Sequence, residues 1–378
     1  MYKKSSVTII ILAILFATYS AMHLGPSWDT FFHYELGKER LDYLFSFGAN
    51  KLNNNQEVIK YYPGSYATIQ AFLVQFFPQK KILESIHFIN LLFSVGTLFG
   101  ISKIAKIFFN KVIGKITFFV CFFNPIFFGH MASSSMDMLI TFCNVWLLYL
   151  IIKYLKNQNN SEKLNKYIIL IALTLGVGLG VRLTFIATII PFLLFLLAEI
   201  IWLKNFITEN FSLKKFFFDL FKILFIAYFT LILFWPHTHD NVFILPFKLA
   251  VEGLKFPFGV PYVLFNEEIF FTRELPISYL LINLFYKMPE YLIISFCIYF
   301  VLFFQLGNFF RKSLKNYNSK IGLIFFIIIF PNIFILFSPY SIYDGLRLFL
   351  YLIPFISIIP SVLIYFLYKN IKKNSFKI

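Results

Sequence analysis

The stretch YIILIALTLGVGLGVRLTFIATIIPFLLFLLAEII, from Tyr167 to Ile201, decides the fold class of this chain. At about 1.5 Å per residue it would form a helix of about 50 Å, whereas the apolar core of a bilayer is about 30 Å thick. Three glycines and an arginine interrupt it midway: Gly176, Gly178, Gly180 and Arg182. The sequence therefore predicts two membrane helices here, over residues 167–181 and 183–203, joined by a tight turn.

The composition of the whole chain indicates the same class of protein. Of its 378 residues 59% are hydrophobic and 14% are charged, whereas a soluble domain has about 45 to 50% apolar and about 25% charged residues. We predict an all-α polytopic membrane protein with short interfacial helices in its outer loops. About ten transmembrane helices are expected, over residues 7–22, 84–109, 116–130, 138–155, 167–181, 183–203, 218–235, 289–310, 321–338 and 347–368.

The distribution of charge predicts the orientation of these helices. Short cytoplasmic connections of membrane proteins collect Lys and Arg. The predicted loops and helix ends on the side of the N terminus carry 22 of the 34 basic residues and only four of the 18 acidic ones. All six histidines and the other acidic residues lie on the opposite side. We expect a plasma (bacterial inner) membrane location with both termini cytoplasmic and the polar chemistry extracytoplasmic.

The predicted topology explains the net charge of +16, because most of the basic residues lie in the predicted cytoplasmic connections. A nucleic-acid surface needs a basic patch on a soluble domain, and the sequence shows none. No Gly-rich nucleotide motif occurs either. We expect a single membrane domain over residues 1–378, with two long extracytoplasmic loops at about 23–83 and 236–288. Long ordered loops often carry function, so these two loops are the first place to look for a site.

Two aspartates at outer helix ends are the candidate catalytic residues. Asp29 follows the first predicted helix, at the headgroup boundary, where partial desolvation favours general-base chemistry. Asp137 lies at the outer end of another predicted helix, after the Asn124-Pro125 segment. Each has an ordinary structural alternative: Asp29 could cap a short helix from Thr30 to Leu41, and Asp137 could interact with a helix macrodipole.

Two arginines at predicted outer helix ends are candidates for binding a donor phosphate. Arg182 interrupts the 167–201 stretch, and Arg347 follows Tyr343-Asp344-Gly345. The guanidinium fork suits bidentate contact with phosphate. The alternatives are snorkelling to the interface, or a local pair such as Asp344 with Arg347.

Further polar and aromatic residues of the outer loops are candidates for substrate binding. Aromatic side chains beside a turn can stack on a sugar ring, although aromatic belts at membrane interfaces have the same composition. The set comprises His33, Glu35, Tyr62, Trp235, His237, Tyr343 and Asp344. The segment His237-Thr238-His239-Asp240 is only a weak metal-binding pattern. We expect neither a bound metal nor another cofactor.

Together these motifs resemble the GT-C superfamily of membrane glycosyltransferases, especially family 39 proteins related to protein O-mannosyltransferases and to the lipid A aminoarabinose transferase. In chain order the matching pieces are the Asp29 loop, Asn124-Pro125 to Asp137, Trp235-Pro236, Leu275-Pro276-Ile277-Ser278-Tyr279 and Tyr343-Asp344-Gly345-Leu346-Arg347. Many relatives carry an Asp-Glu pair where this chain has Asp29-Thr30.

The resemblance implies a polyprenyl-phosphate sugar donor and a lipid, glycan or protein acceptor. Asp29 would be the base or acceptor-orienting carboxylate, Asp137 the second acidic site residue and Arg347 a donor-phosphate contact. Two other classes stay open from the residues alone. A transporter or flippase would place ionisable residues deep within helices, and an O-antigen ligase or polymerase would depend more on outer-loop arginines and histidines.

Overall fold

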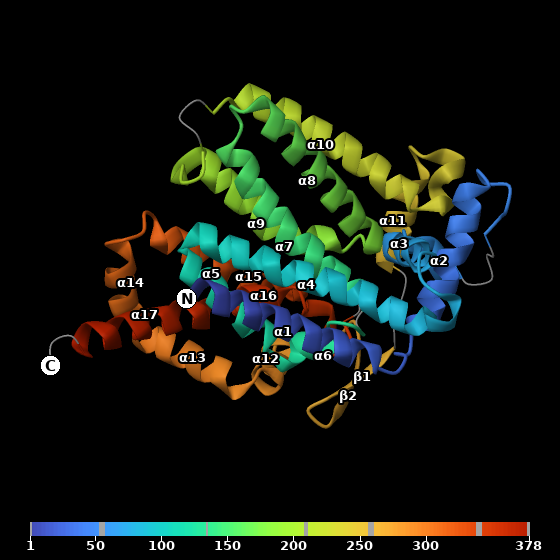
Figure 1. Cartoon of the computed structure of the whole chain (residues 1–378). Coiled ribbons are helices and arrows are strands. Elements are labelled where there is room, and N and C mark those ends of the chain that lie inside the picture. Colours follow the sequence, from blue (N-terminus) through green and yellow to red (C-terminus); the bar gives the residue numbers. More distant parts are fainter. Residues whose placement is uncertain are drawn as a thin grey trace.

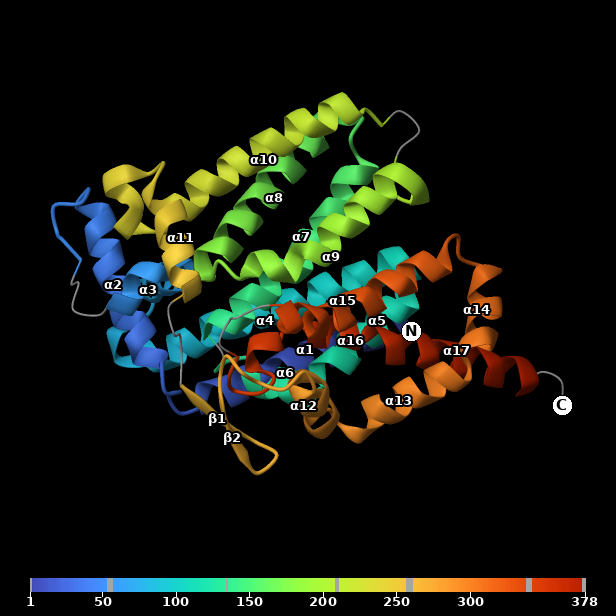
Figure 2. The ribbon, with the colours of Figure 1, turned by 180° about the vertical axis from the view of Figure 1, so that it is seen from behind.

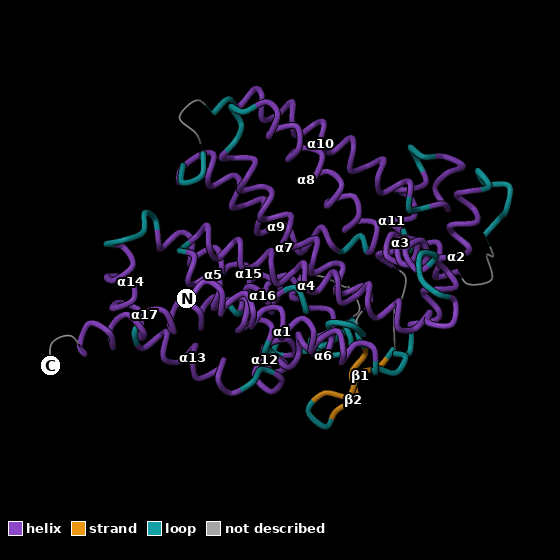
Figure 3. The backbone as a smooth tube through the Cα atoms, viewed as in Figure 1, coloured by secondary structure: helices purple, strands orange, loops and turns teal. Residues whose placement is uncertain are grey.

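The computed structural model describes residues 2–52, 57–133, 135–207, 211–255, 261–337 and 342–375. These residues are almost entirely helical (Figures 1 and 3). The strands are β1 (Tyr262–Phe265) and β2 (Glu268–Phe271), an antiparallel hairpin in the second long loop. The α-helices run as follows: α1 Tyr2–Met22, α2 Thr30–Phe45, α3 Ser65–Val74, α4 Ile82–Phe108, α5 Lys111–Phe122, α6 Pro125–His130, α7 Ser135–Lys156, α8 Ser161–Val181, α9 Phe185–Ala198, α10 Leu213–Leu233, α11 Leu245–Lys255, α12 Tyr279–Lys287, α13 Glu290–Val301, α14 Phe303–Arg311, α15 Tyr317–Phe337, α16 Leu352–Ile356 and α17 Ile358–Ser375.

Five shorter helical segments join these elements. The 3₁₀ turns are Glu57–Tyr61, Gln79–Lys81, Pro236–Asn241 and Arg347–Phe349, and a π-helical turn spans Glu199–Leu203. Helices α2, α3 and α11 gather at the end of the molecule away from the C terminus, in both opposite views (Figures 1 and 2). The two long loops predicted from the sequence therefore contribute to the same end of the bundle.

The all-helical, multi-span prediction is confirmed, but the count of ten spans is not. Within the described ranges seven helices are long and apolar enough to cross a membrane, or up to eight if the bent pair α12 and α13 forms one span. The predicted span 116–130 divides into α5 and α6, because Asn124 caps a new helix that begins at Pro125. The predicted span 289–310 likewise divides into α13 and α14, and residues 7–22 are also too short for this criterion.

The predicted break within residues 167–201 is present. Helix α8 ends at Val181, Arg182 has extended backbone, and α9 begins at Phe185. Gly176 serves a further purpose, since a Cβ there would lie 2.5 Å from the Cβ of Thr230 and 2.7 Å from the carbonyl oxygen of Ala227. This small residue lets α8 and α10 approach closely, as small residues do between membrane helices.

We expect Gly176→Val to lower the thermal unfolding midpoint of the detergent-solubilised protein, because the added side chain would push α8 away from α10. Overpacking of this kind costs about 1 to 3 kcal/mol. Gly322→Val is the matched control, since Gly322 is also helical and a Cβ there would meet nothing within 4 Å. Equal unfolding midpoints for the two variants would contradict the close packing of α8 on α10.

Candidate active site

The turn before α2 holds Asp29 without using its side chain as a helix cap. Asp29 occupies the N-cap position but makes no side-chain capping hydrogen bond. The turn is closed instead by Thr30, whose Oγ1 accepts from the backbone N–H of Ser27 at 3.0 Å. The Ser27 hydroxyl donates to Asp29 Oδ1 at 3.2 Å. The other carboxylate oxygen, Oδ2, is therefore available to partners from elsewhere in the fold.

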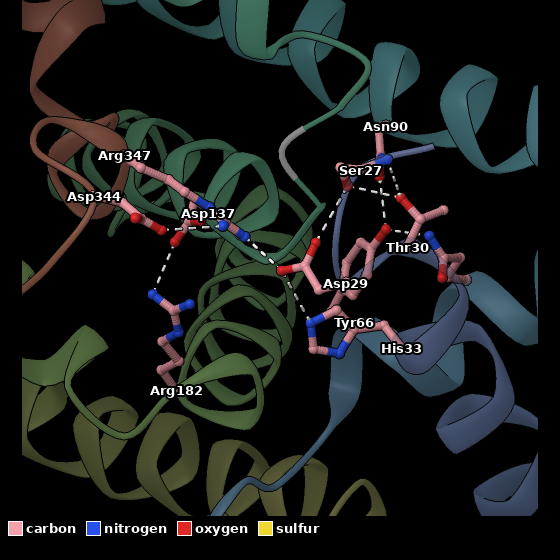
Figure 4. Close-up of polar contacts among 11 residues, drawn as sticks. Ser27, Asp29, Thr30, His33, Tyr66, Asn90, Asp137, Arg182, Asp344 and Arg347 are labelled. Carbon is pink, nitrogen blue, oxygen red and sulfur yellow. Dashed lines mark hydrogen bonds and ion pairs between the residues drawn. The ribbon is translucent and has the colours of Figure 1, made fainter. Parts of the chain in front are cut away.

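Arg347 contacts three carboxylates that come from separate segments of the chain (Figure 4). Its Nη2 lies 2.6 Å from Asp29 Oδ2 and its Nε lies 2.9 Å from Asp137 Oδ2. Its Nη1 lies 3.4 Å from Oδ2 of the more exposed Asp344. The local pair of Asp344 with Arg347 considered from the sequence thus exists, as the longest of three contacts.

Asp137 joins the two predicted phosphate-binding arginines. Its Oδ1 accepts from Arg182 Nη1 at 2.8 Å, while its Oδ2 faces Arg347. The side chain of Asp137 is 3% exposed and that of Arg182 is 8% exposed. Buried charges are tolerated when they are paired and hydrogen-bonded, which is the arrangement here. The carboxylate therefore fixes how both guanidinium groups face the site.

The ion pairs determine the protonation state of the two most connected groups. Burial alone would raise the pKa of Asp29, but the hydrogen bond with His33 and the charge of Arg347 outweigh it, so this pKa lies well below its usual range. Burial would lower the pKa of Arg347, but Asp137 and Asp29 outweigh it and raise this pKa. Both groups are therefore charged at physiological pH. Asp29 is a weak base as long as Arg347 remains beside it.

His33 connects Asp29 to a polar network beneath the site. Its Nε2 lies 3.6 Å from Asp29 Oδ2, and its ring stands edge-on to that of Tyr66, with centroids 6.1 Å apart. The Tyr66 hydroxyl donates to Asn90 Oδ1 at 2.9 Å, and Asn90 Nδ2 donates to the carbonyl oxygen of Ala132 at 2.9 Å. This network links α2, α3 and α4 to the segment before α7 (Figure 4).

A cavity of about 390 Å³ lies over these groups. Asp29, Arg182 and Arg347 line it together with four of the predicted substrate-binding residues, which are His33, Tyr62, Tyr343 and Asp344. Asp137 does not line it and acts through the arginines that it binds. Residues predicted from opposite ends of the sequence thus share one site.

Three predicted substrate-binding residues do not line this cavity. Glu35 is exposed and pairs with Lys38 at 2.6 Å. Trp235 is fully buried and donates from its Nε1 to the carbonyl oxygen of Lys60 at 2.8 Å, so it fixes one loop to the other. His237 is half-buried, and burial together with the charge of Arg40 lowers its pKa to about 4.

Trp28 and Arg40 are two of the cavity residues that were not predicted from the sequence as site residues. Trp28 stands beside Asp29, and its side chain is fully exposed. Arg40 is fully buried on the same face of α2 as His33 and Leu36. The spacing of seven from His33 to Arg40 is the available signal, because residues at i and i+7 share a helix face.

A second, apolar cavity of about 90 Å³ also has Arg182 in its wall. Its other lining is mostly aromatic and aliphatic, including Phe185, Phe330, Phe334 and Tyr351. Across the described parts of the chain, no three His, Cys, Asp or Glu side chains converge as a group suited to a metal ion. In the weak metal pattern, His239 Nε2 lies 2.9 Å from the carbonyl oxygen of Ile232.

Known structures share this architecture. The crystal structure of ArnT from Cupriavidus metallidurans in the apo state matches with a TM-score of 0.62 and 12% identity, over 96% of this chain and 60% of that one. The same enzyme bound to undecaprenyl phosphate matches with a TM-score of 0.61 and 12% identity, over 94% of this chain and 59% of that one. The chain shares the fold of these ArnT structures.

The GT-C resemblance seen in the sequence is thereby confirmed. A family model described as dolichyl-phosphate-mannose-protein mannosyltransferase also matches, over residues 63–237, which include Asp137 and Arg182. A search of curated protein sequences finds no match. The chain spans about 60% of the length of the ArnT structures that it resembles. It is a multi-pass membrane protein.

We expect Asp137→Asn to destabilise the fold far more than Asp344→Asn. The first change leaves Arg182 and Arg347 facing a neutral amide, and breaking a buried ion pair costs about 3 to 5 kcal/mol. The second removes a partner at 3.4 Å whose side chain is 48% exposed, where losses are about 0 to 1 kcal/mol. Thermal unfolding of both variants in detergent measures the difference. Equal losses would contradict the central position of Asp137.

Proposed function

We propose that this chain is a glycosyltransferase that moves a sugar from a polyprenyl-phosphate donor to an acceptor outside the cytoplasm. The single observation that carries the proposal is the cavity of about 390 Å³, in which an ionised aspartate and two arginines face the same space. The GT-C fold adds support, as does undecaprenyl phosphate bound to the similar ArnT. The acceptor is a lipid, a glycan or a protein.

The two cavities that meet at Arg182 suit an amphiphilic donor. The polar cavity offers charged groups for a sugar and a phosphate, and the apolar cavity offers aromatic and aliphatic walls for part of an isoprenoid chain. A donor of this type is confined to the membrane. Its enzyme needs charged groups near the bilayer surface rather than a nucleotide-binding domain.

In the proposed reaction Asp29 engages the hydroxyl of the acceptor and takes its proton. The acceptor oxygen forms a bond to the anomeric carbon, and the bond from that carbon to the phosphate oxygen breaks. The departing phosphate keeps the bonding electrons and gains negative charge. Arg347 and Arg182 stabilise this charge, which is the electrostatic part of the catalysis.

The contact between Arg347 and Asp29 couples removal of the acceptor proton to departure of the phosphate. Before transfer, the charge of Arg347 is balanced largely by Asp29 and Asp137. When Asp29 accepts a proton, it no longer balances Arg347, and the positive charge becomes available to the phosphate that leaves. When Arg347 turns from Asp29 to the phosphate, the basicity of Asp29 rises, because the positive charge beside it has moved away. Asp137 keeps both arginines in place during the exchange.

We expect Asp29→Asn to lower sugar transfer by about 100-fold or more, the usual contribution of a positioned base. The change preserves size and removes the charge. Transfer is measured with purified protein and a lipid-linked sugar donor, and Asp240→Asn is the control because Asp240 is exposed and outside the cavity. Undiminished transfer by Asp29→Asn would reject this mechanism. A solute-uptake defect on gene deletion, with unchanged glycans and lipids, would favour a transporter instead.

The proposed orientation places both termini in the cytoplasm of a bacterial inner membrane and the cavity on the outer face. We expect a cysteine at Asn241 to react with a membrane-impermeant maleimide in intact cells. A cysteine at Lys315, between α14 and α15, is expected to react only after the cells are opened, because this turn belongs to the basic side. Labelling of Lys315→Cys alone in intact cells would reverse the orientation and reject an external active site.

A further inference from the structure

Arg40 differs from the two other arginines that line the polar cavity. Arg182 and Arg347 are held by carboxylates at 2.6 to 2.9 Å. Arg40 has no ion pair with any described side chain within 4.0 Å. The charge of Arg40 is therefore not balanced by a carboxylate in the described part of the site.

The surroundings of Arg40 satisfy its hydrogen bonds only in part. Its Nη2 donates to the carbonyl oxygen of Tyr62 at 2.7 Å and to that of Ile59 at 3.5 Å. Its Nε has no acceptor among the described residues. The side chain is 0% exposed, and burial lowers its pKa to about 10 while the neighbouring Glu39 opposes the change. Arg40 therefore remains protonated at physiological pH, as a buried cation with no ion-pair partner among the described side chains.

The backbone around Arg40 holds its guanidinium group against the cavity wall. Gly64 has φ of +98°, and a Cβ at this position would overlap Arg40 Nη1. The N–H of Gly64 donates to the carbonyl oxygen of Gly180 at 2.8 Å. The guanidinium therefore lies on a glycine that is itself bonded to the end of α8. This close approach requires glycine at position 64.

Among the described side chains, Glu39 acts on Arg40 as a negative charge, whereas the nearby His237 adds none. The pKa of His237 is lowered to about 4 by burial and then by the charges of Arg40, His239 and Lys60, so this imidazole is neutral at physiological pH. Along α2, Arg40 stands about 15 Å from Thr30 at about 1.5 Å per residue. The cavity thus has the ion-paired residues Asp29 and Arg347 at the start of α2. Farther along the same face lies Arg40, which has no ion pair with a described side chain.

We propose that Arg40 is the seat of a phosphate group of a substrate, bound before transfer while Arg182 and Arg347 are still engaged by carboxylates. The inference rests on the proposed function and refines it. Arg40 supplies the positive charge that binds the phosphate, and the other two arginines stabilise the negative charge that develops during transfer. A buried cation without a counter-ion is costly, and a bound anion removes that cost. The phosphate belongs either to the donor lipid or to a phosphorylated acceptor.

Binding to the purified full chain in detergent tests the proposal without requiring turnover. The three probes are undecaprenyl phosphate, undecaprenol and inorganic phosphate. Native mass spectrometry gives the affinities for the two lipids. The rise in the thermal unfolding midpoint measures binding of inorganic phosphate. We expect Arg40→Gln to weaken binding of undecaprenyl phosphate by about tenfold to a hundredfold, the usual range for a charge-assisted hydrogen bond. Binding of undecaprenol is expected to be unchanged. Arg40→Lys, which keeps the charge, is expected to stay within a few-fold of the original protein.

The control variant is Lys38→Gln, which removes a positive charge from the same helix at an exposed position outside the cavity. If Arg40→Gln loses stabilisation by inorganic phosphate but still binds undecaprenyl phosphate, the seat is supported and its phosphate comes from the acceptor. If Arg40→Gln binds both probes as well as the original protein, the proposal is overturned.

Folding of the variants is checked by size-exclusion chromatography. If Arg40→Gln is not recovered folded, Arg40→Lys decides: retained undecaprenyl phosphate binding supports the seat, and lost binding overturns it. If Arg40→Lys does not fold either, Arg40 serves to hold the carbonyl oxygens of Tyr62 and Ile59, and the proposal is overturned. Failure of the proposed function has a different signature, namely Arg40-dependent lipid binding with no sugar transfer under any condition.

Discussion

The ion pairs of Arg347 are the interaction on which the site depends. One guanidinium group contacts Asp29 before α2, Asp137 on α7 and Asp344 in its own turn. Each carboxylate would be costly to bury alone in a protein with so much apolar surface. With Arg182, Arg347 offsets two of the three negative charges, and its contacts tie the segment before α2 to the turn before α16. The cavity keeps its shape because its charged wall is held from several sides.

The sequence predicted this convergence better than it predicted the spans. Asp29, Asp137, Arg182 and Arg347 are predicted as site residues because they lie at the ends of apolar runs, where a carboxylate can act as a base and a guanidinium can bind phosphate. The structure brings the four together. Their roles in transfer remain proposals. The count of about ten spans was not confirmed, because hydropathy does not register local helix breaks. Asn124 caps a helix at Pro125 and shortens one predicted span, and the α13 and α14 break shortens another.

The positions of Arg40 and Trp235 could not be predicted from the sequence. Arg40 follows Lys38 and Glu39, a run that is typical of a solvated helix face, but residues 59–64 dock against it and help to bury it. Trp235 carries the polar Nε1–H expected of a ligand-binding aromatic residue, but this group donates to the backbone at Lys60. In both cases the partner is a carbonyl oxygen from a distant loop. Contacts of this kind leave no pattern in the side-chain sequence.

The separation along the chain between Asp29 and Arg347, 318 residues, has a consequence for biogenesis. During synthesis the N-terminal part of a protein emerges first. Asp29, Asp137 and Arg182 must therefore reach the membrane surface well before the guanidinium that completes their network has been made. Until then Asp137 and Arg182 can pair with each other, whereas Asp29 lacks its guanidinium partner. Maturation of the cavity is thus a late event, which has to follow translation of Arg347.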